Sequence, residues 1–174
     1  MNKKPIKSRN VVHTDMKLRK ATDYLEFDIH SLAAGLEIYL RARGTEIGNA
    51  ALDSFLIRSR LLIDFFLRDS ALPDDVIALD YFHDYSPKPY KPRMPKYVSY
   101  ERDKINKRLM HLTTTPMPRL RSNQRYSIDK IVPPIVRAFR TWLAVVPDNR
   151  IQQPASESRK IFRKHLQRIE RLLP

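Results

Sequence analysis

Apolar positions recur at helical spacing along most of the chain. Over residues 14–44 they follow one another at steps of three and four for three heptads, which predicts a long first helix. Thr14 or Asp15 is placed to cap its start, and Gly44 falls where a left-handed residue commonly ends a helix. Gly35 lies inside the predicted helix, and we expect a second helix to approach it closely. The stripe comprises Leu18, Thr22, Leu25, Ile29, Leu32, Leu36 and Tyr39.

A second amphipathic pattern covers residues 48–68 and has an apolar face wide enough for a central, largely buried helix. Only three residues separate it from the first pattern, so we expect the two helices to form an antiparallel hairpin. Pro73 opens a short predicted helical turn that reaches Tyr81 or Phe82. Four prolines then predict a stiff, extended connector over residues 86–100.

Three more helical patterns follow the connector. The first starts near Ser99 and stops before Pro116, the second starts at Ser127 or Pro133 and stops before Pro147, and the third covers residues 155–173. No segment alternates with the period of a strand. The fold class we predict is all-α: an up-down bundle of four to five helices over residues 14–174, preceded by a disordered basic arm at residues 1–13.

Composition excludes several classes of function. The chain has 174 residues and no cysteine, which rules out disulfides, thiolate zinc sites and thiol catalysis. It has three glycines, and neither of the glycine-rich phosphate-binding motifs occurs in it. No apolar run reaches the length of a membrane span, and no signal peptide is recognisable at the N-terminus. By elimination we expect a cytoplasmic protein without a cofactor.

The formal net charge of +14 points to a polyanionic partner. Residues 21–85 are acidic, with five basic and twelve acidic side chains, whereas residues 86–125 carry eleven basic and two acidic ones. Nucleic acid is the commonest partner of such a surface, and an anionic membrane is second. Solubility alone is a further explanation of the high net charge. The acidic and basic halves of the chain can also pair with each other, within the fold or across a dimer.

The basic connector interleaves four cations with two tyrosines over residues 88–97, as surfaces that grip single strands do. Three arginines of the later loop add to the same basic half of the chain. This pattern predicts binding of nucleic acid, with RNA favoured; the alternatives are an adaptor that binds an acidic protein, or a solvated connector whose tyrosines pack on the bundle. The candidate binding residues are Lys88, Tyr90, Lys91, Arg93, Lys96, Tyr97, Arg119, Arg121 and Arg125.

Two motifs carry a resemblance to known proteins. The segment SFLIRSRLLIDFF at residues 54–66 and the segment INKRLMHLT at residues 105–113 resemble those of a family of uncharacterised bacterial helical proteins. The helical order also resembles, more remotely, the HEPN-type bundles that bind nucleotides and often cleave RNA. The resemblance implies a helical bundle, a homodimer, and metal-independent RNA cleavage by an arginine and a histidine on a late helix.

Carried over to this chain, the resemblance implies a catalytic set of His111, Asn106 and Arg60. Histidine titrates near neutral pH and can move a proton of a ribose hydroxyl, while a guanidinium can hold the phosphate. The position where the family pattern has its arginine is occupied by Ile105. The structural alternatives are a packing role for His111 and an intrahelical ion pair between Arg60 and Asp64. A degenerate ribonuclease is the third function that we consider, after nucleic-acid binding and binding of an acidic protein.

Two further features have simple structural explanations. An acidic group with one histidine offers ligands of the kind that magnesium or manganese prefers, but its spacing matches no metal motif, so we expect no metal site. Its members are Asp74, Asp75, Asp80, His83 and Asp84. The last predicted helix is basic and amphipathic, and we expect it to pack on the bundle or on a partner rather than on a membrane.

Overall fold

The protein is a bundle of helices. The computed structural model describes residues 12–68, 72, 74–91, 95–110 and 126–173, and every regular element within them is helical. This confirms the all-α bundle that the apolar periodicity predicts. No helix in these ranges combines the length and the apolar character needed to cross a membrane. The elements are α1 (Asp15–Arg41), α2 (Glu46–Leu67), the 3₁₀ helix η1 (Ala78–Phe82), α3 (Lys96–Met110), α4 (Ile128–Val145), the 3₁₀ helix η2 (Asp148–Arg150) and α5 (Ala155–Arg171).

Side-chain caps begin the two longest helices. The hydroxyl of Thr14 accepts a hydrogen bond from the backbone N–H of Lys17 at 3.3 Å, and the hydroxyl of Thr45 accepts one from Gly48 at 3.1 Å. Each cap satisfies one of the backbone donors that a helix start leaves without a partner. Gly44 has a φ of 84°, the left-handed conformation expected for it, and lets the chain turn from α1 into α2.

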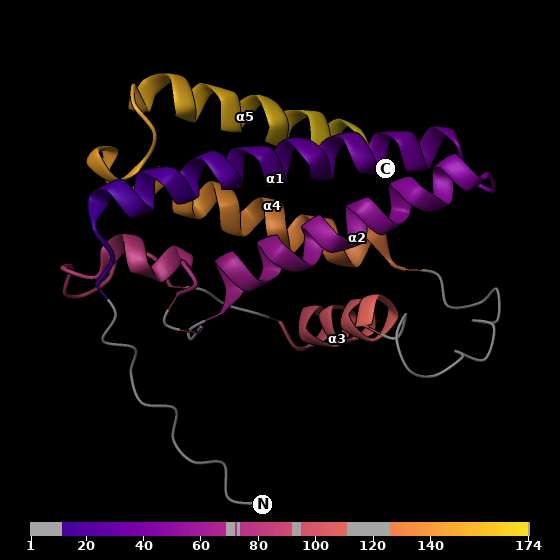
Figure 1. Ribbon diagram of the computed structural model, residues 1–174, viewed down its shortest axis with the longest axis horizontal. Helices are drawn as coiled ribbons and strands as arrows, with labels where there is room; N and C mark the ends of the chain where they lie inside the picture. The colour runs from indigo at the N-terminus through magenta and orange to yellow at the C-terminus, as the bar shows by residue number, and fades with distance from the viewer. Residues whose placement is uncertain (1–11, 69–71, 73, 92–94, 111–125, 174) are drawn as a thin grey trace, which may run out of the picture.

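The first two helices form the predicted antiparallel hairpin (Figure 1), and their backbones pack closely at Gly35. A Cβ atom added there would lie 3.2 Å from the carbonyl oxygen of Ala51 and 3.2 Å from the backbone nitrogen of Phe55. The glycine therefore allows the backbones of the two helices to pack closely, which is the reason expected for its place in a helix interior.

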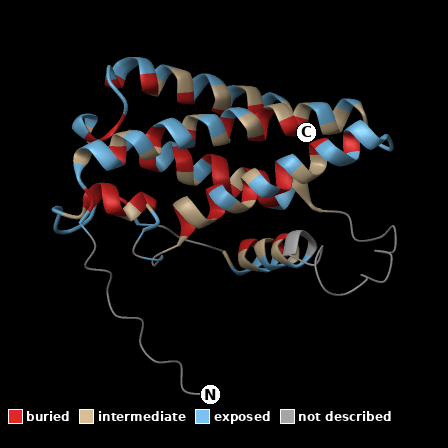
Figure 2. Ribbon diagram, viewed as in Figure 1, coloured by how far each residue is buried: buried red, intermediate tan, exposed pale blue. Residues whose placement is uncertain are grey.

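The other helices pack around this hairpin. Figure 1 shows α5 lying along α1, α4 behind the pair, and α3 below α2 and antiparallel to it. The core is aromatic: the ring of Trp142 lies with its centroid 5.0 Å from that of Tyr81, 5.8 Å from Phe66 and 5.9 Å from Phe65 and Phe139. Buried residues line the inner side of every helix in Figure 2.

Some boundaries differ from those predicted. The turn after α2 is a 3₁₀ helix that begins only at Ala78, and Pro73 lies outside the described residues. The connector ends sooner than expected, because α3 begins at Lys96. Residues 1–11 of the predicted arm also lie outside the described residues. His13 does not belong to an exposed arm, since it is buried and donates a hydrogen bond to the carbonyl of Asp75 at 3.0 Å.

Candidate nucleic-acid interface

Helix α3 is fastened to α2 by a buried apolar side and by one ion pair. Val98 and Ile105 are fully buried on the inner side of α3. On the same side, Nε of Arg102 donates a hydrogen bond to Oδ1 of Asp64 on α2 at 2.5 Å. Both of these charged side chains are only 20% exposed, so solvent screens the pair less than it would a surface pair. The anchor fixes which side of α3 faces outward.

The outer side of α3 combines tyrosines with lysines. Tyr97 is 48% exposed and Tyr100 is 65% exposed, and Lys96 and Lys107 are exposed beside them. Positions 97, 100, 104 and 107 follow one another at steps of three and four, so they share one side of the helix. We call Lys96, Tyr97, Tyr100, Lys104 and Lys107 the α3 face. Figure 2 shows the outer side of α3 as largely exposed.

Lys104 connects the α3 face to the start of α4. Its ammonium lies 5.5 Å from the ring centroid of Tyr100 and 5.5 Å from that of Tyr126, distances at which a cation is attracted to an aromatic face. It also donates a hydrogen bond to Oε2 of Glu101 at 2.9 Å. These contacts hold Lys104 in place and offset part of its charge. Asp103, an exposed carboxylate on the same helix, lies 3.6 Å from the guanidinium of Arg102.

Asp64 lies among three arginines. Besides its hydrogen bond to Arg102, its carboxylate is 3.9 Å from Nε of Arg60 and 3.9 Å from Nη1 of Arg68, each one turn away along α2. The three arginines therefore face two carboxylates, those of Asp64 and Asp103, and the junction of α2 and α3 keeps an excess of positive charge. Nε of Arg60 is buried and makes no hydrogen bond in the described part of the chain, nor does the buried Oδ1 of Asn106.

Two of the three residues implied as catalytic lie on neighbouring helices. Arg60 is on α2 and Asn106 is on α3, one turn beyond the arginine that bonds to Asp64. His111 lies outside the described residues, so whether the three residues share a cleft remains a prediction. Ile105, at the position of the family's arginine, is 0% exposed and belongs to the core. A guanidinium at that position would have to be buried between the helices.

The candidate binding residues fall into three groups. Lys88, Lys91, Lys96 and Tyr97 are exposed, as a role in binding requires. Tyr90 is 1% exposed and its hydroxyl donates a hydrogen bond to the carbonyl of Phe66 at 2.7 Å, so its ring has no free face for stacking and it leaves the candidate surface. The arginines outside the described residues are Arg93, Arg119, Arg121 and Arg125.

Sequence reasoning missed three residues of the α3 face. Tyr100, Lys104 and Lys107 were not among the candidates because the connector was expected to run to residue 100. The signal that identifies them is the helical spacing of Tyr97, Tyr100, Lys104 and Lys107, two aromatic positions followed by two basic ones. Arg102 was also missed as an anchor, since its partner lies 38 residues away in the sequence.

The acidic group after α2 has structural partners. Oδ2 of Asp80 accepts a hydrogen bond from the backbone N–H of Ile77 at 2.8 Å. Asp84 receives two hydrogen bonds of 2.6 Å from the guanidinium of Arg150, which lower the pKa of its carboxyl to about 2. Arg150 is itself buried and ties this segment to η2 and to the start of α1 through Asp15. The ion pairs thus connect the acidic segment to the bundle.

Comparisons with known proteins give no assignment. The sequence matches no protein-family model and no curated protein, and no solved structure matches the chain. The functional argument therefore rests on the residues of the α3 face and on their surroundings.

Proposed function

We propose that the protein binds single-stranded nucleic acid, RNA above all, through the α3 face. The observation that supports this most strongly is that two exposed tyrosines lie between lysines on one side of a helix. Proteins that bind single strands commonly combine aromatic rings, on which bases stack, with cations that pair with phosphates. Every base has a face that can stack, so such a surface binds with little sequence preference.

The arrangement gives each kind of side chain a separate task. Bases stack on the exposed rings of Tyr97 and Tyr100, and each stacked base contributes about 1–3 kcal/mol. Lys96 and Lys107, near opposite ends of the helix, pair with phosphates, and their charge makes the affinity fall as salt rises. The arginines around Asp64 add positive potential at the inner edge of the face.

Helix α5 is the rival surface, because it carries six basic and two acidic residues against five and two on α3. Its cations serve other purposes in part: Arg159 donates hydrogen bonds to the end of α4, and Arg168 bonds to Glu37 on α1. No large apolar or aromatic side chain is exposed on α5. It offers a strand positive charge without a stacking surface, and this difference favours α3.

Fluorescence anisotropy with labelled oligouridylate and oligothymidylate tests the proposal. Replacing Tyr97 and Tyr100 together by alanine is expected to weaken binding by at least about tenfold, the loss that corresponds to one stacked base. The matched control is Tyr85→Ala, which removes a tyrosine that is 44% exposed on another part of the surface. Its affinity should equal that of the unaltered protein.

A second pair of variants separates the two basic helices. Lys96→Gln with Lys107→Gln is expected to weaken binding and to flatten its salt dependence, whereas Lys160→Gln with Lys164→Gln on α5 has a smaller effect. The proposal fails if neither oligonucleotide binds, if the α5 pair has the larger effect, or if polyglutamate competes as well as unlabelled RNA does. The last outcome would point to an acidic protein as the partner.

A further inference from the structure

The outward sides of α4 and α5 carry a group of cations that make no contact with a carboxylate. The two helices hold nine basic and three acidic residues. Arg159 and Arg168 bond to neighbouring elements, and Arg140 and Lys160 lie beside the two carboxylates of α5. The other five side chains form neither a hydrogen bond nor an ion pair within the described ranges: Lys130, Arg137, Arg163, Lys164 and Arg171.

Helical spacing places these cations on one surface. On α4, Lys130, Arg137 and Arg140 are separated by seven and three residues, so they share one side. On α5, positions 160, 163, 164, 167 and 171 follow one another at steps of three and four, and all of them are exposed. A hollow of about 140 Å³ connects the two sides, because Arg140 and Ala144 line it from α4 and Arg163 lines it from α5. We call Lys130, Arg137, Arg163, Lys164 and Arg171 the α4–α5 face.

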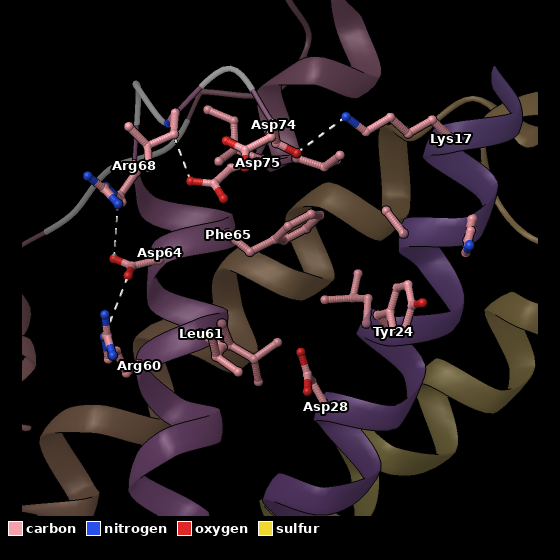
Figure 3. A pocket seen from close by; sticks show the side chains of 17 residues that line it. Lys17, Tyr24, Asp28, Arg60, Leu61, Asp64, Phe65, Arg68, Asp74 and Asp75 are labelled. Atoms are coloured by element: carbon pink, nitrogen blue, oxygen red, sulfur yellow. Dashed lines mark hydrogen bonds and ion pairs between the residues drawn. The ribbon is translucent and has the colours of Figure 1, made fainter. Parts of the chain in front are cut away.

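The cations that line the groove between α1 and α2 are different, because three of the four are engaged within the chain. Figure 3 shows the carboxylate of Asp64 between Arg60 and Arg68. It also shows the ammonium of Lys17 bonded to the backbone carbonyl of Asp74. The α4–α5 face, in contrast, leaves its cations available to an outside ligand.

The α4–α5 face offers almost nothing apolar. Of all the side chains on the two helices, Val145 at the end of α4 is the only large apolar one that is exposed, at 37%. Protein interfaces have an apolar, often aromatic centre, and helices that lie on membranes insert an apolar side. On α5 that side is already used, because Phe162 and Leu166 are fully buried in the bundle. The chemistry of the face therefore fits neither a protein partner nor a membrane.

The outside of a nucleic-acid duplex fits a face of this kind. Its bases are stacked inside the helix and its phosphates lie outside, so cations alone can hold it. A duplex presents one charge per about 1.7 Å of its axis, and the stripe from Lys160 to Arg171 is about 16 Å long, so several phosphates lie within reach. The hollow is smaller than the roughly 300–1,000 Å³ of a small-molecule pocket. A single strand would find no ring here on which to stack its bases.

We propose that the α4–α5 face binds double-stranded nucleic acid through its phosphates and without reading its sequence. Arg137 and Arg163 form forked hydrogen bonds with phosphate oxygens, and Lys130 and Lys164 contribute point charges. The proposal does not depend on the α3 face, because it concerns a different surface and a different form of nucleic acid.

Fluorescence anisotropy with a labelled RNA duplex of mixed sequence tests the proposal. Arg163→Gln with Lys164→Gln should weaken binding at least about tenfold at about 0.1 M salt and lower the slope of log affinity against log salt by about two, because two phosphate contacts are lost. The matched control is Lys20→Gln with Arg43→Gln, which removes the same charge from exposed positions on α1 and the turn after it. This control should keep the salt slope of the unaltered protein.

The tyrosine variant of the α3 face separates this proposal from the binding of single strands. Tyr97→Ala with Tyr100→Ala should leave duplex affinity unchanged while it weakens the binding of oligouridylate. If no duplex binds, or if this variant weakens duplex binding more than the α5 variant does, the α4–α5 proposal is wrong even where oligouridylate binds to the α3 face. Displacement of the duplex by polyglutamate or by phosphatidylserine vesicles, as readily as by unlabelled duplex, would also overturn it.

Chemical labelling locates the bound duplex. The chain has no cysteine, so a single introduced cysteine is the only thiol that a maleimide can label. Gln167→Cys, at an exposed position between the cations of α5, should react severalfold more slowly once duplex saturates the protein. Ser54→Cys, at an exposed position on α2, should keep its rate. An unchanged rate at position 167 in the saturated complex would place the duplex on another face, and the proposal would be wrong.

Discussion

Asp64 on α2 accepts a hydrogen bond of 2.5 Å from Arg102 on α3, and this contact determines which residues of α3 face outward. If α3 were rotated about its axis, Tyr97 and Tyr100 would turn toward the bundle. The pair therefore joins the fold to the proposed function: an acidic residue of the central hairpin orients the basic helix on which we propose that nucleic acid binds.

Asp64→Ala is expected to lower the free energy of unfolding by about 1–3 kcal/mol, because a charge-assisted bond between half-buried groups is lost. Affinity for RNA should stay the same or rise, because the buried Val98 and Ile105 still hold the same side of α3 against the bundle and the substitution removes a negative charge beside three arginines. Urea unfolding and fluorescence anisotropy measure the two effects. The matched control is Asp103→Ala, which removes a carboxylate that is 59% exposed and should change stability by less than about 0.5 kcal/mol. Weaker RNA binding with unchanged stability would contradict the assigned role.

Tyr90→Phe is expected to destabilise the protein by about 1 kcal/mol and to leave RNA binding unchanged. The substitution keeps the buried ring but removes the hydroxyl that bonds to the carbonyl of Phe66, leaving a buried acceptor without that partner. Tyr97→Phe, at an exposed position, should change neither property, because a phenylalanine ring stacks as well. If Tyr90→Phe weakened RNA binding more than it weakened the fold, Tyr90 would have to be restored to the interface.

Two glycines of the α1–α2 turn should differ in their tolerance of alanine. At Gly48 a Cβ atom would lie 2.0 Å from the carbonyl oxygen of Ala42, so the backbone would have to move. At Gly44 nothing lies within 4 Å, and the cost is that of a left-handed conformation, about 1–2 kcal/mol. We therefore expect a greater loss of stability for Gly48→Ala, measured from urea midpoints. A larger loss of stability for Gly44→Ala would contradict the close approach of Gly48 to the carbonyl of Ala42.

Stability should fall in mildly acidic solution because of His165 on α5. Burial, together with the positive charges of His30, Arg168 and Lys164, lowers the pKa of His165 below its ordinary value of 6.5. The unfolded chain then takes up a proton at a pH where the folded chain does not. This destabilising effect of His165 is absent well above pH 6.5. The free energy of unfolding decreases as the pH falls through 6.5 toward the lowered pKa.

Unfolding by urea at a series of pH values on both sides of 6.5 measures this effect. His165→Gln should reduce the loss of stability on acidification, and His30→Gln should reduce it in part, since the two rings lie with centroids 5.0 Å apart. His83→Gln, which alters the histidine that ends η1, should leave the contribution of His165 to the pH dependence as it is. An unchanged dependence in His165→Gln would show that other groups cause it.

Local features of the sequence were sufficient to predict the fold class. The period of the apolar residues, the short link between the first two helices and the glycine at position 35 all act over a few turns of helix, so the hairpin could be predicted. The start of α3 could not be fixed, because Pro95 is compatible both with an extended connector and with the residue before a helix.

The candidate site was only partly predictable, because its side chains take their roles from distant partners. Tyr90 and Tyr97 lie in the same basic tract, yet one reaches the last turn of α2 and the other faces outward. The partner of Arg102 comes from another helix, and nothing near it in the sequence identifies that partner. Helical spacing alone would have found Tyr100 and Lys107, once α3 was known to begin at Lys96.

Photo-crosslinking of the protein to an oligonucleotide that contains 4-thiouridine tests the central claim most directly. Cleavage after Lys96 and Arg102 releases residues 97–102, a peptide that holds both exposed tyrosines of the α3 face. Mass spectrometry should find the main crosslinks in this peptide, and unlabelled RNA should suppress them. Crosslinks confined to α5 or to the α1–α2 hairpin, or none at RNA concentrations that saturate binding, would contradict the assignment of the α3 face.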